Sequence, residues 1–184
     1  MNLFEIIPAQ LQTKEWRKNQ DWYNGGKHNE CEKYQLELVK TITSFSCSNT
    51  CIRLNNNKDK KYKMEYNEFP LKKDDGYDWT EDFDGFINTN NKKYYLNLKM
   101  VCDNGGAQTR TLREVNHFIR CQMNNLMTNN SENIYFINIL DGDTSHKSMR
   151  YFNNTLNEFE TYKKYVFVGD MYDFDIWWNS QYSS

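Results

Sequence analysis

Long hydrophobic runs are absent from this sequence of 184 residues, and their absence excludes a membrane-spanning helix. No stretch approaches the roughly 18 consecutive apolar residues that a membrane-spanning helix requires. The N-terminal residues Met1–Pro8 contain neither the basic region nor the long apolar core of a signal peptide. We therefore expect a protein without membrane association, located in the cytoplasm or elsewhere inside the cell.

An excess of positive charge is also absent. The formal net charge is -2, which excludes the globally basic surface typical of non-specific nucleic-acid-binding proteins. Basic residues are instead grouped, and each group either contacts phosphate or surrounds a solvent-exposed turn. The groups are Lys58, Lys60, Lys61 and Lys63; Lys72 and Lys73; Lys92 and Lys93; and Arg110 and Arg113.

Cysteine is too sparse and too irregularly spaced for a disulfide framework. The chain has five cysteines, an odd number, which favours reduced thiols. Cys47 and Cys51 have the spacing of half a zinc site, but no second Cys or His pair follows at suitable spacing.

Proline is scarce and no low-complexity linker interrupts the chain, so we expect residues 1–184 to form a single domain.

The spacing of apolar residues predicts alternating helices and strands. Apolar residues recur at helical spacing in 28–45, 109–127 and 147–159. The nearly continuous apolar runs 133–140 and 165–168 suit strands buried on both faces. Residues 61–68 alternate as a half-exposed strand does, 46–60 are loop-like, and the tail with Trp177 and Trp178 packs back onto the domain. This order predicts an α/β fold with a mixed, partly parallel β-sheet flanked by helices.

The most informative stretch is a predicted β-hairpin formed by 83–88 and 93–102. An Asn pair at positions 90 and 91 favours a turn centred between them. That turn places Phe86 opposite Tyr95 and Asp84 opposite Asn97, with Cβ atoms about 5 Å apart across each pair.

Strand alternation then places Asn97 and Lys99 on one face, while Leu96, Leu98 and Met100 face the core. An acid, an amide and an ammonium held together on rigid strands are suited to metal-assisted hydrolysis. The acid and amide oxygens hold a divalent ion that activates water and polarises phosphate, and the lysine stabilises the developing charge.

This pattern resembles the PD-(D/E)XK nuclease superfamily, and within it the type II restriction endonucleases. The resemblance implies a restriction-endonuclease-like core and a Mg²⁺-dependent, sequence-specific endonuclease that cuts double-stranded DNA as a homodimer. It also implies that Asp84 is a metal ligand, that Asn97 and the Leu98 carbonyl complete the metal site, and that Lys99 is the catalytic lysine. Position 97 departs from the family, which has Glu or Asp there, so more of the metal coordination falls to the DNA phosphate.

Two further sets of residues are candidates for this site. Within this fold the first helix often contributes a Glu, and Glu30 is the preferred candidate, with Glu37 as the alternative. After the hairpin, Gly105 and Gly106 precede a helix N-terminus, where backbone can approach a phosphate closely. Gln108, Thr109, Arg110 and Arg113 are the predicted DNA contacts. Each set also has a purely structural explanation. The glutamate is then a solvated helix carboxylate, the two glycines form a strand-to-helix turn, and Thr109 or Thr111 is the N-cap of the helix.

Three alternative functions remain open. The chain could be a catalytically inactive nucleic-acid-binding protein of the same fold, or a repair or recombination nuclease. A small-molecule phosphohydrolase using Asp141 and Asp143 is less favoured, because that motif lies too late in the chain.

Overall fold

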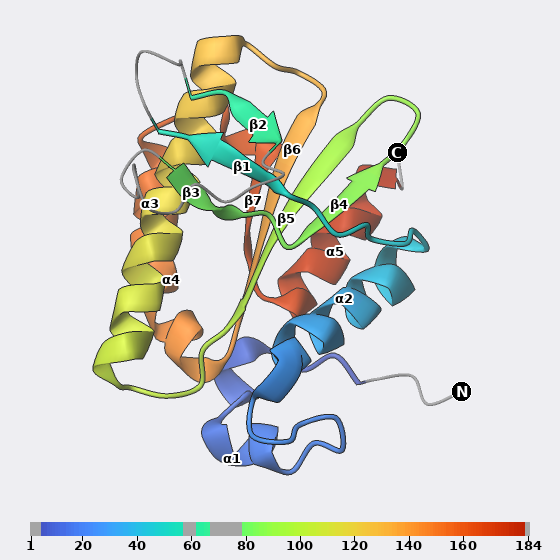
Figure 1. Cartoon of the computed structure of the whole chain (residues 1–184), viewed down its shortest axis with the longest axis vertical. Helices are drawn as coiled ribbons and strands as arrows, with labels where there is room; N and C mark the ends of the chain where they lie inside the picture. The colour runs from blue at the N-terminus through green and yellow to red at the C-terminus, as the bar shows by residue number, and fades with distance from the viewer. Residues whose placement is uncertain (1–4, 57–61, 67–78, 183–184) are drawn as a thin grey trace.

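A mixed four-stranded sheet forms the centre of the protein (Figure 1). The computed structural model describes residues 5–56, 62–66 and 79–182. The strands lie in the order β4-β5-β6-β7. Their bounds are β4 (Gly85–Asn88), β5 (Lys93–Met100), β6 (Ile134–Asp141) and β7 (Val166–Gly169). The pair β4 and β5 is antiparallel, whereas β5, β6 and β7 are parallel, so the predicted mixed sheet is confirmed.

Among the described residues, five α-helices accompany the sheet, and four of them cover its two faces (Figure 1). Their bounds are α1 (Lys14–Lys18), α2 (Glu30–Thr43), α3 (Gly106–Asn129), α4 (Asp143–Asn157) and α5 (Met171–Tyr182). Helices α2 and α5 pack on one face of the sheet, and α3 and α4 pack on the other. Short 3₁₀ helices lie at Ala9–Leu11, Lys27–Asn29 and Lys163–Tyr165. No helix in the described part of the chain is long and apolar enough to cross a membrane.

A second, smaller sheet was not predicted. Its strands β1 (Ile52–Asn55), β2 (Met64–Tyr66) and β3 (Trp79–Asp82) lie in the order β2-β1-β3. The prediction of a loop over 46–60 is therefore wrong for β1, where the run is too short to show a period and its last three residues are all buried. Strand β2 lies within the predicted strand 61–68. Lys58, Lys60, Lys61, Lys72 and Lys73 lie outside the described residues.

Helices α3, α4 and α5 differ most from the sequence prediction. Helix α3 begins at Gly106, so Thr109 and Thr111 lie inside the helix and neither is its N-cap. Their hydroxyls donate to carbonyls one turn earlier, Thr109 to Gly105 at 3.3 Å and Thr111 to Ala107 at 3.1 Å. Helix α4 likewise begins four residues earlier than predicted. Helix α5 was not predicted because apolar residues occur all around it, but Trp178 is buried as expected for a tail that packs back.

Gly142 makes the connection from β6 to α4 possible. Its φ of +94° is in the left-handed region that favours glycine, and a Cβ there would overlap the backbone of Val101. Its N–H donates to Oε1 of Gln12 at 2.7 Å. The close approach fixes the end of β5 against the start of α4.

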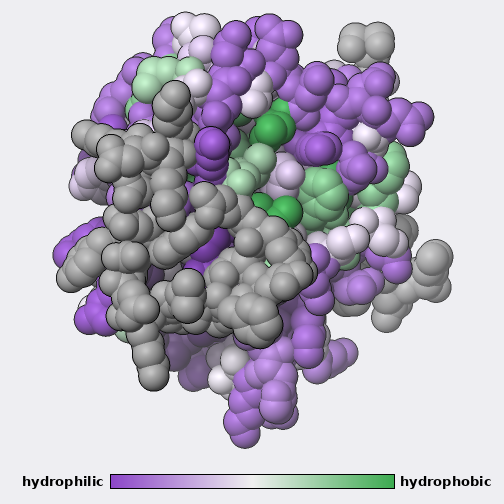
Figure 2. All heavy atoms as spheres, turned by 45° about the horizontal axis from the view of Figure 1, so that its top comes forward, coloured by the Kyte–Doolittle hydropathy of each residue, from purple (hydrophilic) through white to green (hydrophobic). Residues whose placement is uncertain are grey.

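In the face drawn in Figure 2, hydrophilic side chains predominate around a small apolar area. Large exposed hydrophobic side chains occur on several elements, among them Tyr151 on α4 and Tyr172 and Ile176 on α5.

Candidate active site

Asp84 lies at a β-bulge at the start of β4, and this bulge decides where its carboxylate points. Gly85 is paired with Leu96 of β5, and the Asp84 N–H also donates to the Leu96 carbonyl at 2.8 Å. Two consecutive residues of one strand therefore face a single residue of its partner, which defines a bulge. The predicted pairing of Asp84 with Asn97 is consequently not found.

The aromatic residues on either side of Asp84 support the bulge. Phe86 pairs with Tyr95, as the predicted turn requires, and their ring centroids are 5.0 Å apart. The ring of Phe83 also contacts Tyr95, at 5.3 Å. In a regular strand, residues three positions apart point to opposite faces. An extra residue between Phe83 and Phe86 therefore brings both rings to the face that α3 covers.

The carboxylate of Asp84 and the ammonium of Lys99 lie beside each other at the edge of β5. Oδ2 of Asp84 accepts a hydrogen bond from the Leu98 N–H at 2.7 Å and lies 3.8 Å from Nζ of Lys99. Nζ of Lys99 also donates to Oε2 of Glu81 at 3.0 Å. The Asp84 and Lys99 side chains are 15% and 21% exposed, so the pair is largely buried but reachable from solvent.

The two groups have raised pKa values for different reasons. Burial raises the pKa of the Asp84 carboxyl from its ordinary 3.8 to about 6, although Lys99 and the Leu98 N–H counteract part of the rise. Burial lowers the pKa of Lys99, but the nearby Asp84 and Glu81 carboxylates outweigh burial, so the net pKa is raised. Lys99 is therefore a firmly charged ammonium, while Asp84 is poised to exchange its proton near neutral pH.

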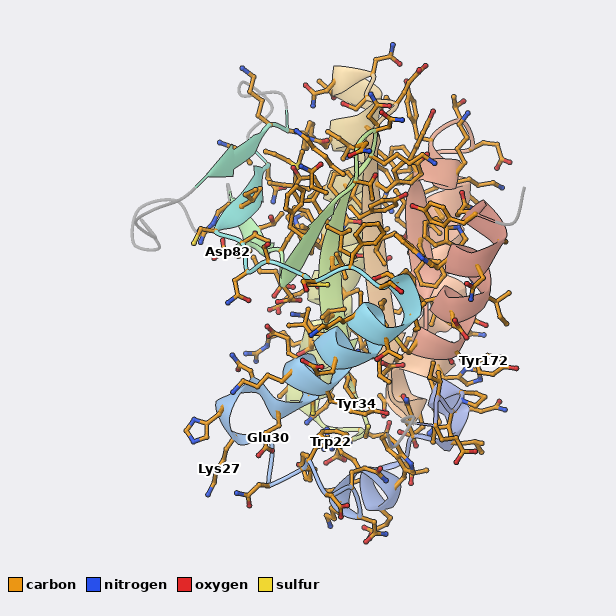
Figure 3. The ribbon with its side chains drawn as sticks, turned by 90° about the vertical axis from the view of Figure 1, so that its right-hand side faces the viewer. Trp22, Lys27, Glu30, Tyr34, Asp82 and Tyr172 are labelled. Carbon is orange, nitrogen blue, oxygen red and sulfur yellow. The ribbon has the colours of Figure 1, made fainter. Side chains whose placement is uncertain are left out.

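Glu32, which the sequence analysis did not single out, is the α2 carboxylate near this pair. Its charge raises the pKa values of both Asp84 and Lys99. Glu30, the preferred candidate, instead accepts hydrogen bonds from the backbone N–H groups of Asn24 (2.7 Å) and Gly26 (3.1 Å). Figure 3 shows Glu30 at the N-terminal end of α2, well separated from Asp82 of β3. Glu30 thus holds the preceding loop.

Asn97 lies in the core between β5 and α3, and its side chain is fully buried. Its Nδ2 donates to Oδ1 of Asn138 at 3.0 Å, and Gln122 of α3 exchanges two hydrogen bonds with Asn138, at 2.8 and 2.9 Å. Oδ1 of Asn97 is buried without a hydrogen-bond partner in the described part of the chain. The structure therefore brings Asp84 and Lys99 together but leaves Asn97 in a separate polar network.

Oxygen atoms suited to a divalent ion are present beside Asp84. Because the Leu98 N–H points to Asp84, the Leu98 carbonyl points to the same edge of β5, where β4 has ended. Oδ1 of Asp84 accepts no hydrogen bond from the residues that the structure describes. Within those residues, no group of three or more His, Cys, Asp or Glu side chains could hold a metal ion. A metal here would need Asp84, the Leu98 carbonyl, and oxygens from substrate and water.

The four predicted DNA contacts are divided between two sides of α3. Gln108 lines a cavity of about 210 Å³ together with Arg17, Lys99 and Thr111. Thr109 and Arg113 line a different cavity, of about 520 Å³, between α3 and α4. Arg110 is exposed on the helix. Arg17 was not predicted as a site residue, because this cavity brings together residues that are far apart in the chain.

Comparison with known proteins identifies no relative: no family model, no curated protein and no solved structure matches the chain.

Proposed function

We propose that the protein is a Mg²⁺-dependent endonuclease that hydrolyses phosphodiester bonds in double-stranded DNA in the manner of a type II restriction enzyme. The observation that carries this proposal is the Asp84 carboxylate 3.8 Å from the Lys99 ammonium at an open strand edge. A mixed sheet flanked by helices, with this pair at the hairpin, supports a restriction-endonuclease-like core.

Asp84 and the Leu98 carbonyl are the groups that would hold Mg²⁺, which prefers oxygen ligands and retains several waters. A bound Mg²⁺ supplies an activated water and polarises the phosphate. The raised pKa of Asp84 means that its proton must leave before it can act as a ligand, so Mg²⁺ affinity is expected to fall below about pH 6. Lys99 stabilises negative charge that develops on the phosphate.

The cavity beside Lys99 supports phosphate binding next to this pair. Arg17 contributes a second cation there, and the N-terminal turn of α3 contributes backbone N–H groups and the positive end of its dipole. Gln108 contributes an amide that can donate to phosphate or to a base. Cutting both strands at one site requires two such centres, so we propose a homodimer.

A plasmid-cleavage assay in Mg²⁺ or Mn²⁺ tests the proposal. We expect wild-type protein to convert supercoiled DNA to nicked and linear forms, and Asp84→Asn and Lys99→Met each to reduce the rate at least about 100-fold. The exposed residues Asp21 and Lys33 offer matched controls, Asp21→Asn and Lys33→Met, which should cleave at the wild-type rate. Absence of nicking on DNA of many sequences, with either metal, would refute the enzyme assignment.

A second candidate function is non-catalytic nucleic-acid binding, and the position of Asn97 favours it. An acid or amide at this position cannot serve a metal while it remains in the α3 core. The plasmid-cleavage assay separates the two candidates, and the variant Asn97→Asp tests whether position 97 belongs to the metal site. If position 97 is structural, the substitution places an unpaired carboxylate opposite Asn138 Oδ1, and we expect about 2–3 kcal/mol lower stability with no gain in cleavage.

If Asn97→Asp instead cleaves DNA faster than the wild type, position 97 belongs to the metal site.

A third candidate, a repair or recombination nuclease, predicts preferential cleavage of nicked, branched or single-stranded DNA in the same assay.

A further inference from the structure

A cavity of about 520 Å³ lies between the first turns of α3 and α4, apart from the Asp84–Lys99 pair. Its volume is within the range of small-molecule sites and is large for a simple anion. Its base is apolar, because Leu112 and the buried Phe152 line it. The cavity can therefore hold an organic group as well as a charge.

Positive charge at this cavity is not balanced by a lining carboxylate. Arg113 of α3 and Lys147 of α4 line the cavity from its two sides, and both are exposed. No Asp or Glu is among its described lining residues, and neither cation has an ion pair with the described part of the chain. Such a pair of cations on two helices is complementary to a phosphate group.

Tyr151 adds an aromatic surface to the same cavity. It is 53% exposed although it lines the cavity. The guanidinium of Arg150 lies 4.8 Å from its ring centroid and donates to its hydroxyl at 2.9 Å. Arg150 is not among the residues that line the cavity. The tyrosine ring offers a planar group in the cavity an aromatic surface on which to stack.

Two amides provide hydrogen-bond donors for such a planar group. Oδ1 of Asn104 accepts from the hydroxyl of Thr144 at 3.3 Å, and Oδ1 of Asn116 accepts from the hydroxyl of Thr155 at 2.7 Å. Each hydroxyl also has a second acceptor, Oδ1 of Asp143 for Thr144 at 3.5 Å and the Tyr151 carbonyl for Thr155 at 3.2 Å. Neither Nδ2 makes a hydrogen bond with the residues that the structure describes, so both can donate to a ligand. Both asparagines line the cavity.

We propose that this cavity binds one nucleotide, with its base stacked on Tyr151 and its phosphate between Arg113 and Lys147. The nucleotide is either free or the end of a nucleic-acid strand, since both present the same base and phosphate. The site does not contain the Asp84–Lys99 pair, so it does not rest on the proposed cleavage.

Calorimetric titration of the full-length protein tests the proposal with four probes: dTMP, thymidine, inorganic phosphate and a 5′-phosphorylated oligothymidylate. We expect dTMP or the oligonucleotide to bind at least about tenfold more tightly than thymidine or phosphate, because only these present both groups. A preference for dTMP identifies a free nucleotide as the ligand, and binding of the oligonucleotide alone identifies a strand end.

Variants connect the binding to the cavity. Tyr151→Ala should weaken binding at least about tenfold, Tyr151→Phe should preserve it, and Arg113→Ala with Lys147→Ala should weaken it and reduce its salt dependence. Tyr172→Ala and Lys33→Ala are matched controls on α5 and α2. The Asp84→Asn variant should bind nucleotide normally, which separates this site from the proposed active site.

The proposal is overturned if neither dTMP nor the oligonucleotide binds, if inorganic phosphate binds as tightly as both, or if the Tyr151 and Arg113 variants bind like the wild type.

Discussion

Asp84 and Asp141 are two buried carboxyl groups whose surroundings differ. Burial raises the pKa of each to about 6. Asp141, at the end of β6, is fully buried and both of its oxygens accept hydrogen bonds, Oδ2 from Gln35 Nε2 at 2.8 Å and Oδ1 from the Met171 N–H at 3.0 Å. Asp84 instead lies at a strand edge beside the ammonium of Lys99.

This comparison shows that a raised carboxyl pKa does not by itself identify a functional site. The same shift arises wherever burial outweighs nearby donors. What differs is whether an oxygen remains accessible and whether a cation accompanies it. Asp141 joins β6 to α2 and α5, because its two donors come from those helices. It is therefore a structural group, and this argues against a phosphohydrolase that uses Asp141 as its nucleophile.

The largest effect on stability is expected for Asp141, whose carboxylate is fully buried. Asp141→Ala leaves the Met171 N–H and Gln35 Nε2 buried without this acceptor, and we expect it to lower the free energy of unfolding by about 2–4 kcal/mol. Asp84→Ala should cost no more than about 1 kcal/mol, because water can reach the groups it exposes. Urea denaturation of both variants at pH 7 measures the difference, and equal losses would remove the distinction between the two carboxyl groups.

A smaller effect with a defined pH dependence is expected for Asp84→Asn. The folded-state pKa of Asp84, about 6, exceeds its ordinary 3.8, so between these values the folded protein binds more protons and its stability falls as pH rises. Asn removes this loss but can still accept from the Leu98 N–H. We expect the free energy of unfolding of the variant, relative to that of the wild type, to rise by about 1–3 kcal/mol between pH 4 and pH 8. The lower end of this range allows for screening by solvent, because Asp84 is partly exposed.

Parallel denaturation series at pH 4, 6 and 8 check this prediction. The exposed Asp21→Asn variant is the control, and its difference from wild type should not change with pH in the same direction. A gain that appears toward low pH would show that the pKa of Asp84 is lowered in the folded protein.

The smallest effect concerns the neighbouring acid on α2. Glu32 raises the pKa of Asp84 through its charge, so Glu32→Gln should lower that pKa. Glu30→Gln should leave it unchanged, because Glu30 binds the backbone of Asn24 and Gly26. Titration of the Asp84 side-chain carboxyl by NMR measures both variants. A shift with Glu30→Gln alone would restore Glu30 as the α2 candidate.

Local sequence patterns determined most of the secondary structure. The spacing of Tyr34, Leu38 and Ile42 predicts α2, and the apolar run from Ile134 predicts the central buried strand β6. The Asn pair at the turn fixed the Phe86–Tyr95 pairing. These features depend on residues close in the chain, where period and turn chemistry are sufficient.

Tertiary structure decided the surroundings of the candidate site. Alternation assigns Asn97 to a face of β5, but only the packing of α3 determines that this face is closed. The bulge at Asp84 shifts the strand by one residue, because the rings of Phe83 and Phe86 both pack against Tyr95. The proximity of Asp84 to Lys99, like the cavity between α3 and α4, likewise depends on contacts between distant segments that no local pattern specifies.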